Sequence, residues 1–231
     1  MIHDFPELIN EKLLERARKL SVAQLCDGMK ELNIPKSGCM RYDINAIHPS
    51  MKVVGTAMTV ETDNGDNFPI HVATYSIPCA GYVMVIDGKG HTEKAYLGDL
   101  IMGAAKAAGY AGVVIDGCTR DRDGNVALNF PVFSKGLMPA GPIKKDPGNV
   151  NGKIVCGGIE VNPGDLIAGD HDGVCVVPRG KIEEVLVQAE KKGDYEKKRN
   201  ETIKAYNDAK ANGKPLPELA PQWVLDMLAK K

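Results

Sequence analysis

Two stretches of the sequence, GYVMVIDGKG (81–90) and GDLIMGAAKAAGYAGVVIDGCTRD (98–121), decide the fold. Each contains a short apolar run that ends in Asp-Gly, as buried strands do (83–86 and 113–116), and an Ala-rich amphipathic helix (98–109) lies between them. If the two strands are parallel neighbours, a right-handed crossover returns the chain. The start of the helix and the residues after the second strand then meet at the carboxyl edge of the sheet, where open α/β sheets bind ligands.

Three charged residues are expected to face one another in that crevice: Asp99 at the helix start, and Arg120 and Asp121 after the second strand. The free N–H groups of residues 99–101 suit a carboxylate, and Arg120 offers a fixed fork for a carboxylate or a developing oxyanion. Asp99 and Asp121 are hard oxygen ligands, which together with water suit Mg²⁺ or Mn²⁺ better than zinc. The pattern indicates a small anionic oxo-acid held on a divalent metal. Two alternatives stay open: Asp99 as a helix N-cap only, and Arg120-Asp121 as an exposed ion pair.

The composition is that of an ordinary globular protein. The 231 residues can bury one sizeable core, and 26% of them are charged. A net charge of −1 and 5% aromatic residues disfavour nucleic-acid binding, because little would neutralise phosphates or stack on bases. No stretch has the ~18–20 apolar residues of a membrane span, and the charged N-terminal segment is unlike a signal peptide. We therefore expect a cytoplasmic protein with no nucleic-acid or membrane partner.

Helices are predicted at both ends of the chain, with strands between them. Residues 7–33 have apolar positions at helical spacing and form two helices, the second capped by Ser21 with Gln24 three positions later. The further expected elements are a strand at 52–61, a helix near 69–75, a strand at 130–136, three short strands within 153–161, 165–173 and 174–178, a helix over 180–212 interrupted at Gly193, and a helix near 221–228. We expect one domain over 1–231, divided into N-terminal helices (1–35), a core (36–179) and a C-terminal helical extension (180–231).

Histidines and cysteines offer few other site candidates. His171 lies between two acids, but the segment reads as a turn at Gly173 rather than a metal cluster. His71 is expected on a helix near the site in a structural role, and His91 on the loop that enters the catalytic helix. The six cysteines show no C-x-x-C pairing, so we expect reduced, mostly buried thiols rather than disulfides or a zinc site.

The sequence also resembles a known enzyme family. The stretch 98–121 is similar to the signature of the class II 4-hydroxy-4-methyl-2-oxoglutarate/4-carboxy-4-hydroxy-2-oxoadipate aldolases, whose relatives include the regulator of ribonuclease E activity A. The resemblance covers residues 21–179 in ordered succession. Its further motifs are GDNFPIH (65–71), GYVMVIDGKG (81–90), FPVFSKG (130–136) and PGDLIAGDHDGVCVVP (163–178).

The resemblance implies an α/β fold of the three-layer β/β/α swivelling-domain type, assembled as a homotrimer or homohexamer with sites at subunit interfaces. It implies that Asp121 binds a divalent metal directly, Mg²⁺ or Mn²⁺, and that Asp99 binds it through water. A glutamate from the C-terminal helix of a neighbouring subunit would complete the metal site, again through water. Glu196 in DYEKKRNE is the matching residue here.

The resemblance also assigns the substrate contacts. Arg120 would hold the keto oxygen of pyruvate. The backbone that follows Gly98, at Asp99, Leu100 and Ile101, would receive the pyruvate carboxylate. The chain keeps the Arg-Asp pair, which non-catalytic regulators of the family tend to alter. It departs where the aldolases often have an acid three positions after the aspartate: Gly124 stands there, with Asp123 one residue earlier. This difference concerns the substrate more than the metal.

Together these features predict a metal-dependent aldolase that cleaves a 4-hydroxy-2-oxo acid to pyruvate and a carbonyl product. The metal and Arg120 would stabilise the pyruvate enolate formed when the C3–C4 bond breaks. Decarboxylation of oxaloacetate passes through the same enolate and is expected as a side activity. The alternative is a non-catalytic protein-binding regulator similar to the ribonuclease E inhibitor. A methyltransferase is disfavoured, because the sequence lacks a glycine-rich nucleotide fingerprint.

Overall fold

The computed structural model describes residues 1–75 and 79–230, which form two compact units, Met1–Ala189 and Glu190–Lys231. The first unit holds the sheet and the predicted catalytic residues. The second consists of most of α6 (Ile182–Ala211) together with α7 (Gln222–Ala229). No helix in the described part of the chain is both long enough and apolar enough to cross a bilayer. The single domain expected from the sequence remains a prediction.

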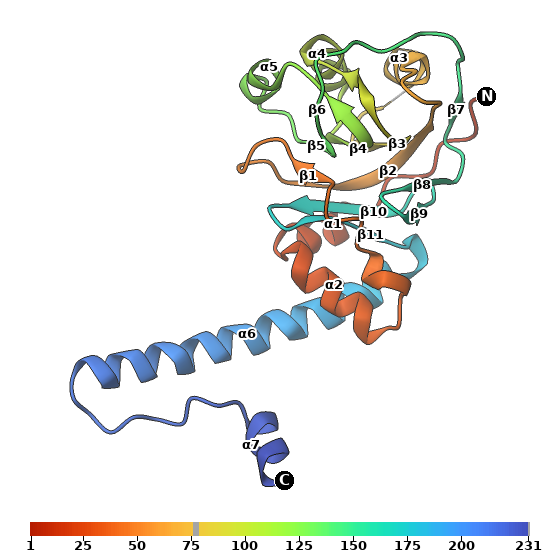
Figure 1. Cartoon of the computed structure of the whole chain (residues 1–231). Helices are drawn as coiled ribbons and strands as arrows, with labels where there is room; N and C mark the ends of the chain where they lie inside the picture. The colour runs from red at the N-terminus through yellow and green to blue at the C-terminus, as the bar shows by residue number, and fades with distance from the viewer. Residues whose placement is uncertain (76–78, 231) are drawn as a thin grey trace. The chain divides into compact units, whose positions relative to one another are not determined.

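The first unit contains short helices and a mixed sheet (Figure 1). Its helices are α1 (Glu11–Arg18), α2 (Val22–Glu31), α3 (Phe68–Tyr75), α4 (Asp99–Ala108) and α5 (Arg122–Ala127), with 3-10 turns η1 (Pro35–Gly38) and η2 (Arg179–Lys181). Its strands are β1 (Asn45–Ala46), β2 (Val53–Glu61), β3 (Tyr82–Leu97), β4 (Gly112–Thr119), β5 (Val132–Ser134), β6 (Gly136–Leu137), β7 (Asn149–Val150), β8 (Ile154–Cys156), β9 (Ile159–Val161), β10 (Leu166–Asp170) and β11 (Gly173–Val177).

The main sheet has the order β1-β5-β4-β3-β2-β10-β11, with β6 beside β4 and β7 beside β2, while β8 and β9 form a separate hairpin. As predicted, β3 and β4 are parallel neighbours joined through α4. Every residue of β4 is buried, as expected for a parallel strand with both faces covered. Helices α3, α4 and α5 lie on one side of β3–β5, and β10 and β11 lie on the other (Figure 1). This arrangement confirms the predicted β/β/α fold class.

Apolar side chains fill three clusters that follow these layers. One lies under α3 and α4 and includes Ile70, Met102 and Ile115. A second lies between the strands of the two β layers and includes Val114, Phe133 and Ile167. The third joins α1, α2 and the first turns of α6 to β10 and β11, and includes Leu25, Leu166 and Leu186. The predicted capping box of α2 is present, with Ser21 and Gln24 bonded reciprocally.

Several sequence-based boundaries were wrong, among them that of the second apolar strand, which was predicted to end at Asp116-Gly117 and continues as β4 to Thr119. The strand predicted to end at Asp87-Gly88 continues to Leu97, so His91 lies in β3 rather than on a loop. Register shifts against β4 at His91 and Ala95 let this polar stretch stay in the sheet. The segment 153–161 forms two strands instead of one, because Gly157 and Gly158 adopt φ values of 58° and 75° and turn the chain between them.

A further correction concerns α6, which runs through Gly193 without the predicted interruption. A glycine within a helix costs about 1 kcal/mol relative to alanine, which the good helix formers around it offset. The other predicted elements are present: the strand at 52–61, the helices at 69–75 and 98–109, and the last helix. His171 occupies the turn between β10 and β11, where Gly173 has a φ of 127°, as the sequence indicated.

Candidate active site

The first turn of α4 presents unused backbone N–H groups at the carboxyl edge of the sheet. Gly98 is the N-cap in an extended conformation (φ −132°, ψ −175°) and makes no side-chain cap bond. The helix bonds begin with Met102, whose N–H donates to the carbonyl of Gly98 at 3.0 Å. The amides of residues 99–101 precede that bond and have no acceptor within the helix, so this turn is suited to an anion. Asp99 is therefore the first helical residue rather than the cap.

Asp121 stands opposite, at the end of β4, in a backbone conformation that is rare outside glycine. It is the N-cap of α5 with φ 57° and ψ 47°. The buried Asn125 holds this turn: its backbone N–H donates to the Asp121 carbonyl (3.0 Å), and its Nδ2 donates to the Arg120 carbonyl (2.7 Å). Such strain persists only where neighbouring contacts enforce it, and it often marks a functional site.

Arg120 and Asp121 lie side by side at the surface of the site. Arg120 Nε is 3.4 Å from Asp121 Oδ2, and each side chain is 43% exposed. Both groups are therefore paired loosely and remain open to a ligand. Arg120 is anchored by its backbone, whose N–H donates to the Leu97 carbonyl at the end of β3 (2.9 Å).

Two glycines leave room for the carboxylates of the site. Gly98 lets the Asp121 carboxylate approach α4, and Gly124 lets the Asp99 carboxylate approach α5. A Cβ on Gly98 would lie 2.2 Å from Asp121 Oδ2, so the Asp121 carboxylate occupies the space above the α4 cap. A Cβ on Gly124 would lie 2.6 Å from Asp99 Oδ2, so the Asp99 carboxylate rests on the first turn of α5. Gly124, where the resemblance to the aldolases led us to expect an acidic residue, is thus the residue on which Asp99 packs.

One cavity of about 320 Å³ joins these groups. It is lined by the predicted residues Gly98, Asp99, Leu100, Ile101, Arg120 and Asp121. Further lining residues were given no site role from the sequence. They are Asn67, His71, Tyr75, Tyr96, Leu97, Pro142 and Lys144. The structure therefore brings together every predicted site residue of the first unit. Glu196 belongs to α6 in the second unit, and its role as a neighbour's ligand remains a prediction.

The side of the cavity that faces Lys144 carries groups suited to a second anion. Lys144 is exposed and forms no ion pair within the described residues. The ring of His71 stacks on Tyr75 with centroids 5.8 Å apart. Burial, and secondly the charge of Lys144, lower the pKa of His71, so this imidazole is neutral near pH 7. A neutral imidazole beside an unpaired ammonium group can donate a hydrogen bond to a substrate carboxylate.

The GDN motif at 65–67 explains how Lys144 reaches the cavity. Asp66 is buried, and its Oδ2 accepts the backbone N–H groups of Lys145 (3.0 Å) and Asp146 (2.9 Å). Asn67 is also buried; its Nδ2 donates to the Tyr96 carbonyl (2.9 Å), and its Oδ1 has no partner in the described part of the chain. Asp66 thus fixes the loop that carries Lys144, and Asn67 offers an unused acceptor at the cavity wall.

Among the described residues, two acidic side chains line this cavity, those of Asp99 and Asp121. No group of three or more His, Cys, Asp or Glu side chains able to hold a metal occurs in the described chain. Structural zinc sites have four protein ligands and catalytic ones three, so two carboxylates do not fit zinc. Mg²⁺ keeps several waters and commonly takes one or two carboxylates, which fits the two carboxylates present here.

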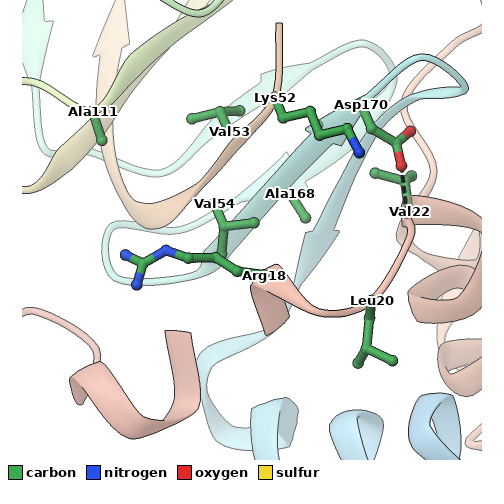
Figure 2. Close-up of a pocket in the computed structure, with 10 residues that line it drawn as sticks. Arg18, Leu20, Val22, Lys52, Val53, Val54, Ala111, Ala168 and Asp170 are labelled. Carbon is green, nitrogen blue, oxygen red and sulfur yellow. Dashed lines mark hydrogen bonds between the residues drawn. The ribbon is translucent and has the colours of Figure 1, made fainter. Parts of the chain in front are cut away.

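A second cavity, of about 410 Å³, lacks such chemistry (Figure 2). Its walls are mostly aliphatic, and its charged groups are Arg18, Lys52 and Asp170. Arg18 is already paired with Glu11, and Asp170 accepts the backbone N–H of Val22 at 2.9 Å. Because the Arg18 guanidinium and the Asp170 carboxylate already form contacts within the protein, this cavity is a weaker candidate for catalysis.

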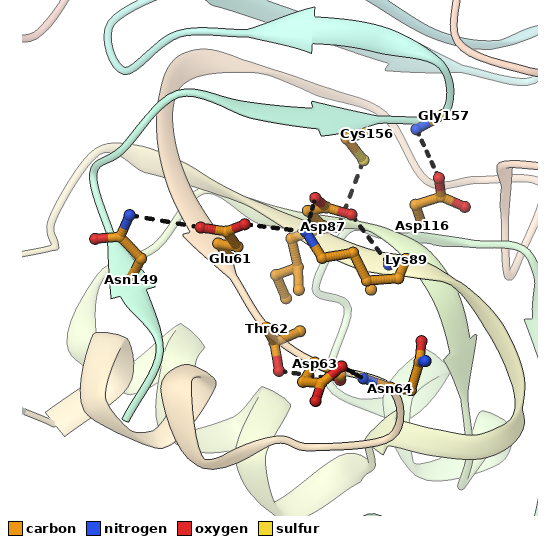
Figure 3. Close-up of polar contacts among 12 residues, drawn as sticks. Glu61, Thr62, Asp63, Asn64, Asp87, Lys89, Asp116, Asn149, Cys156 and Gly157 are labelled. Atoms are coloured by element: carbon orange, nitrogen blue, oxygen red, sulfur yellow. Dashed lines mark hydrogen bonds and ion pairs between the residues drawn. The ribbon is translucent and has the colours of Figure 1, made fainter. Parts of the chain in front are cut away.

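The two aspartates that end the apolar runs, Asp87 and Asp116, form internal bonds near the β8–β9 hairpin (Figure 3). Asp87 Oδ2 lies 2.7 Å from Lys89 Nζ. The Asp116 carboxylate accepts a hydrogen bond from the Arg41 guanidinium (2.7 Å) and another from the backbone N–H of Gly157 in the hairpin turn (3.0 Å). Asp116 therefore fastens the hairpin turn to β4, Asp87 pairs within β3, and neither aspartate lines the candidate site.

Comparison with known proteins places these motifs in one family. The family model described as RraA-like, Aldolase/RraA, matches residues 22–176. A Halalkalibacterium halodurans protein named "Putative 4-hydroxy-4-methyl-2-oxoglutarate aldolase" is 44% identical over 160 residues, which are 69% of this chain and 76% of that protein.

Solved structures share the fold. An uncharacterized protein from Pseudomonas syringae superposes with a TM-score of 0.74 at 28% identity, covering 87% of this chain and 92% of the other. Streptomyces coelicolor RraAS2, titled an unusual member of the RNase ES inhibitor RraA protein family, also has a TM-score of 0.74, at 26% identity, with 83% and 97% covered. The family thus includes proteins named as aldolases and proteins named as inhibitors.

Proposed function

The chain belongs to the RraA-like Aldolase/RraA family, and we propose that it is a divalent-metal-dependent aldolase that cleaves a 4-hydroxy-2-oxo acid to pyruvate and a carbonyl product. One observation carries this proposal: Asp99, Arg120 and Asp121 line one cavity together with the free amides of the α4 turn. A protein that only binds another protein has no need of this combination. The name of the Halalkalibacterium halodurans relative, "Putative 4-hydroxy-4-methyl-2-oxoglutarate aldolase", agrees with it.

The pyruvyl half of the substrate would lie between α4 and Arg120. Its carboxylate would accept hydrogen bonds from the amides of residues 99–101, where the helix dipole also favours a negative charge. The guanidinium of Arg120 would then donate to the 2-keto oxygen. The distal half would extend toward Lys144 and His71, which suits a substrate with a second carboxylate. A 4-hydroxy-4-methyl-2-oxoglutarate-like dicarboxylic acid meets these requirements.

Mg²⁺ or Mn²⁺ would be held directly by Asp121 and through water by Asp99, with Glu196 of a neighbouring subunit approaching through water in a homotrimer or homohexamer. When bound, the metal would supply positive charge that stabilises the enolate. The strained αL backbone of Asp121 and the absence of a side chain at Gly98 support this assignment, because together they place the Asp121 carboxylate at the N-terminus of α4.

Cleavage requires loss of the C4 hydroxyl proton, breakage of the C3–C4 bond, and movement of that electron pair into a pyruvate enolate. Arg120 stabilises the charge that develops on the enolate oxygen, and the amides of residues 99–101 keep the carboxylate in place while it develops. Protonation at C3 then yields pyruvate. Loss of carbon dioxide from oxaloacetate produces the same enolate, so we also propose oxaloacetate decarboxylase activity.

The test is pyruvate release from 4-hydroxy-4-methyl-2-oxoglutarate and from oxaloacetate, with Mg²⁺ and with EDTA. Arg120→Ala and Asp121→Asn are expected to lower kcat/KM at least 100-fold, in the range found when a group that stabilises the transition state is removed. Neighbouring Arg122→Ala and Asp123→Asn are matched controls, since neither residue lines the cavity. Mn²⁺ binding, followed by calorimetry, should weaken in Asp121→Asn alone among these four variants.

A second candidate is a non-catalytic regulator of a ribonuclease, favoured by the fold shared with the protein titled as an RNase ES inhibitor family member. It predicts no turnover of either acid and no metal binding. Metal-dependent pyruvate release that is lost in both site variants and kept in both controls would reject it. Metal binding without turnover would leave the metal assignment in place and point to a different oxo-acid.

A further inference from the structure

Three thiols meet where α2, η1 and β11 pack together, away from the candidate active site. Cys26 lies on α2, Cys39 directly follows η1, and Cys175 lies on β11. The sulfur atoms of Cys26 and Cys39 are 2.9 Å apart. The Cys26 thiol also hydrogen-bonds to that of Cys175, and Cys39 faces Cys175 in an isolated antiparallel bridge.

Cys26 and Cys39 are the two members of the six cysteines that are partly exposed, whereas the other four are buried. A disulfide bond is about 2.05 Å long, so the two sulfur atoms need to approach by less than 1 Å to form one. The two thiols already lie within hydrogen-bond distance, so the step begins from a short sulfur–sulfur contact. An oxidant can also reach this pair from solvent.

The segment between the two thiols contains a strained turn. Lys36, Ser37 and Gly38 adopt positive φ values of 53°, 50° and 64° in succession. L-residues pay an energetic cost in the left-handed region, and two of these three residues are not glycine. The turn is held by few local bonds, among them the Cys39 N–H to the Lys36 carbonyl (3.0 Å). A covalent link from Cys39 to α2 would therefore restrain a turn that is costly to maintain.

We propose that Cys26 and Cys39 are a reversible oxidation site, at which a disulfide fastens the η1 turn to α2. The oxidant is a low-molecular-weight disulfide such as oxidised glutathione. The Cys39 thiolate attacks one sulfur of this reagent and releases one thiol. Cys26 then loses its proton, attacks the Cys39 sulfur and expels the second thiol. The protein gives up two electrons and two protons, and the reagent is reduced to two thiols.

The environment of the pair sets the rate of this exchange. Burial and the neighbouring Cys26 raise the pKa of the Cys39 thiol to about 12. The hydrogen bond to Cys175, burial and the nearby Asp27 carboxylate raise the pKa of Cys26 still further. Because the thiolate is the nucleophile, oxidation near neutral pH is slow and accelerates about tenfold for each added pH unit. The geometry favours the bond once formed, while the high pKa delays its formation.

The experiment uses the full chain incubated in glutathione buffers of increasing oxidised fraction at pH 8.5, quenched with acid and alkylated. The oxidised protein carries two alkyl groups fewer than the reduced protein, and peptide mapping of the wild type identifies the bonded pair. We expect a Cys26–Cys39 link that dithiothreitol reverses, and an oxidised protein whose thermal midpoint is several degrees higher, since the bond closes a loop of about 14 residues.

Variants separate this pair from general thiol oxidation. Cys39→Ser and Cys26→Ser should form no intramolecular disulfide, whereas the buried Cys79→Ser control should behave as the wild type. The proposal is overturned if the native wild type keeps six free thiols in fully oxidised glutathione while the denatured chain is oxidised. It is equally overturned if mapping finds Cys175 in the bond. Because the mapping is done on the wild type, misfolding of a serine variant does not affect the answer.

Discussion

Substituting Gly98 by alanine should separate the chemistry of the site from the stability of the fold. The added methyl carbon would lie 2.2 Å from Asp121 Oδ2, and real Cβ atoms essentially never come within 3.0 Å of another heavy atom. The carboxylate oxygen must therefore retreat by about 0.8 Å. A misplacement of about 1 Å at a reacting centre can cost ~100-fold in rate, so we expect a fall in kcat/KM of roughly 30- to 100-fold.

Stability should change little in the same variant. The φ of −132° and ψ of −175° at Gly98 are accessible to alanine, and the atom that the methyl group displaces is the end of an exposed side chain. Replacing an N-cap glycine by alanine costs less than about 1 kcal/mol. The thermal midpoint is therefore expected within a few degrees of the wild type, because 1 kcal/mol corresponds to roughly 2–4 °C in a chain of this size.

The assay is pyruvate release from 4-hydroxy-4-methyl-2-oxoglutarate with saturating Mg²⁺, alongside a thermal melt. Gly180→Ala is the matched control, since a methyl group there meets nothing within 4 Å. Wild-type kcat/KM in Gly98→Ala, with an unchanged melt, would refute the argument that Asp121 acts from the space above this glycine. A loss of activity shared by the control would show that the effect is not specific to the site.

Other measurements test the remaining inferences. Lys144→Ala should raise KM for the dicarboxylic substrate about 2- to 5-fold, with kcat little changed, because an exposed charge contributes up to about 1 kcal/mol; the increase should shrink at high salt. A hydrogen bond from Lys135 lowers the pKa of Asp43, so this carboxylate stabilises the fold above its unfolded pKa of about 4 and loses that effect below it. The difference in urea midpoint between wild type and Asp43→Asn should therefore shrink as the pH falls from 6 to 3. Leu186→Ala should cost about 2–5 kcal/mol in denaturant unfolding because this side chain is fully buried, whereas exposed Leu228→Ala should change it by less than about 0.5 kcal/mol.

The sequence predicted elements best where local signals agree. The helix over 98–109 has apolar residues at helical spacing and glycines at both ends, and α4 ends as predicted at Gly109 with a φ of 100°. The second half of β3 gave no such signal, because residues 88–94 are polar and do not alternate. That half is held by irregular pairing with β4, at His91 with Gly117 and Ala95 with Cys118. These contacts join residues more than 20 positions apart, so a local pattern cannot reveal them.

The difference between local signals and long-range contacts also explains which site residues could be predicted from the sequence. Asp99, Arg120 and Asp121 could be found from the sequence because each stands at the end of a recognisable element, and parallel strands bring such ends together. Lys144 could not, since it lies in a Pro- and Gly-rich connection without periodicity. Its position depends on the pairing of residue 143 with residues 65–67, through Ile143 N–H to the Gly65 carbonyl (2.8 Å) and Asn67 N–H to the Ile143 carbonyl (3.1 Å).

Glycine, rather than any charged residue, sets how closely the carboxylates of the site approach. Asp121 occupies the space that a side chain at position 98 would fill, and Asp99 occupies the space at position 124. The charged residues indicate which chemistry is available, but the two bare Cα atoms decide whether the carboxylates share one crevice. An acidic side chain at position 124, where the aldolases often have one, would compete with Asp99 for the first turn of α5. In this chain the carboxylate that faces α5 therefore comes from Asp99 on α4, and Gly124 leaves free the space that this carboxylate occupies.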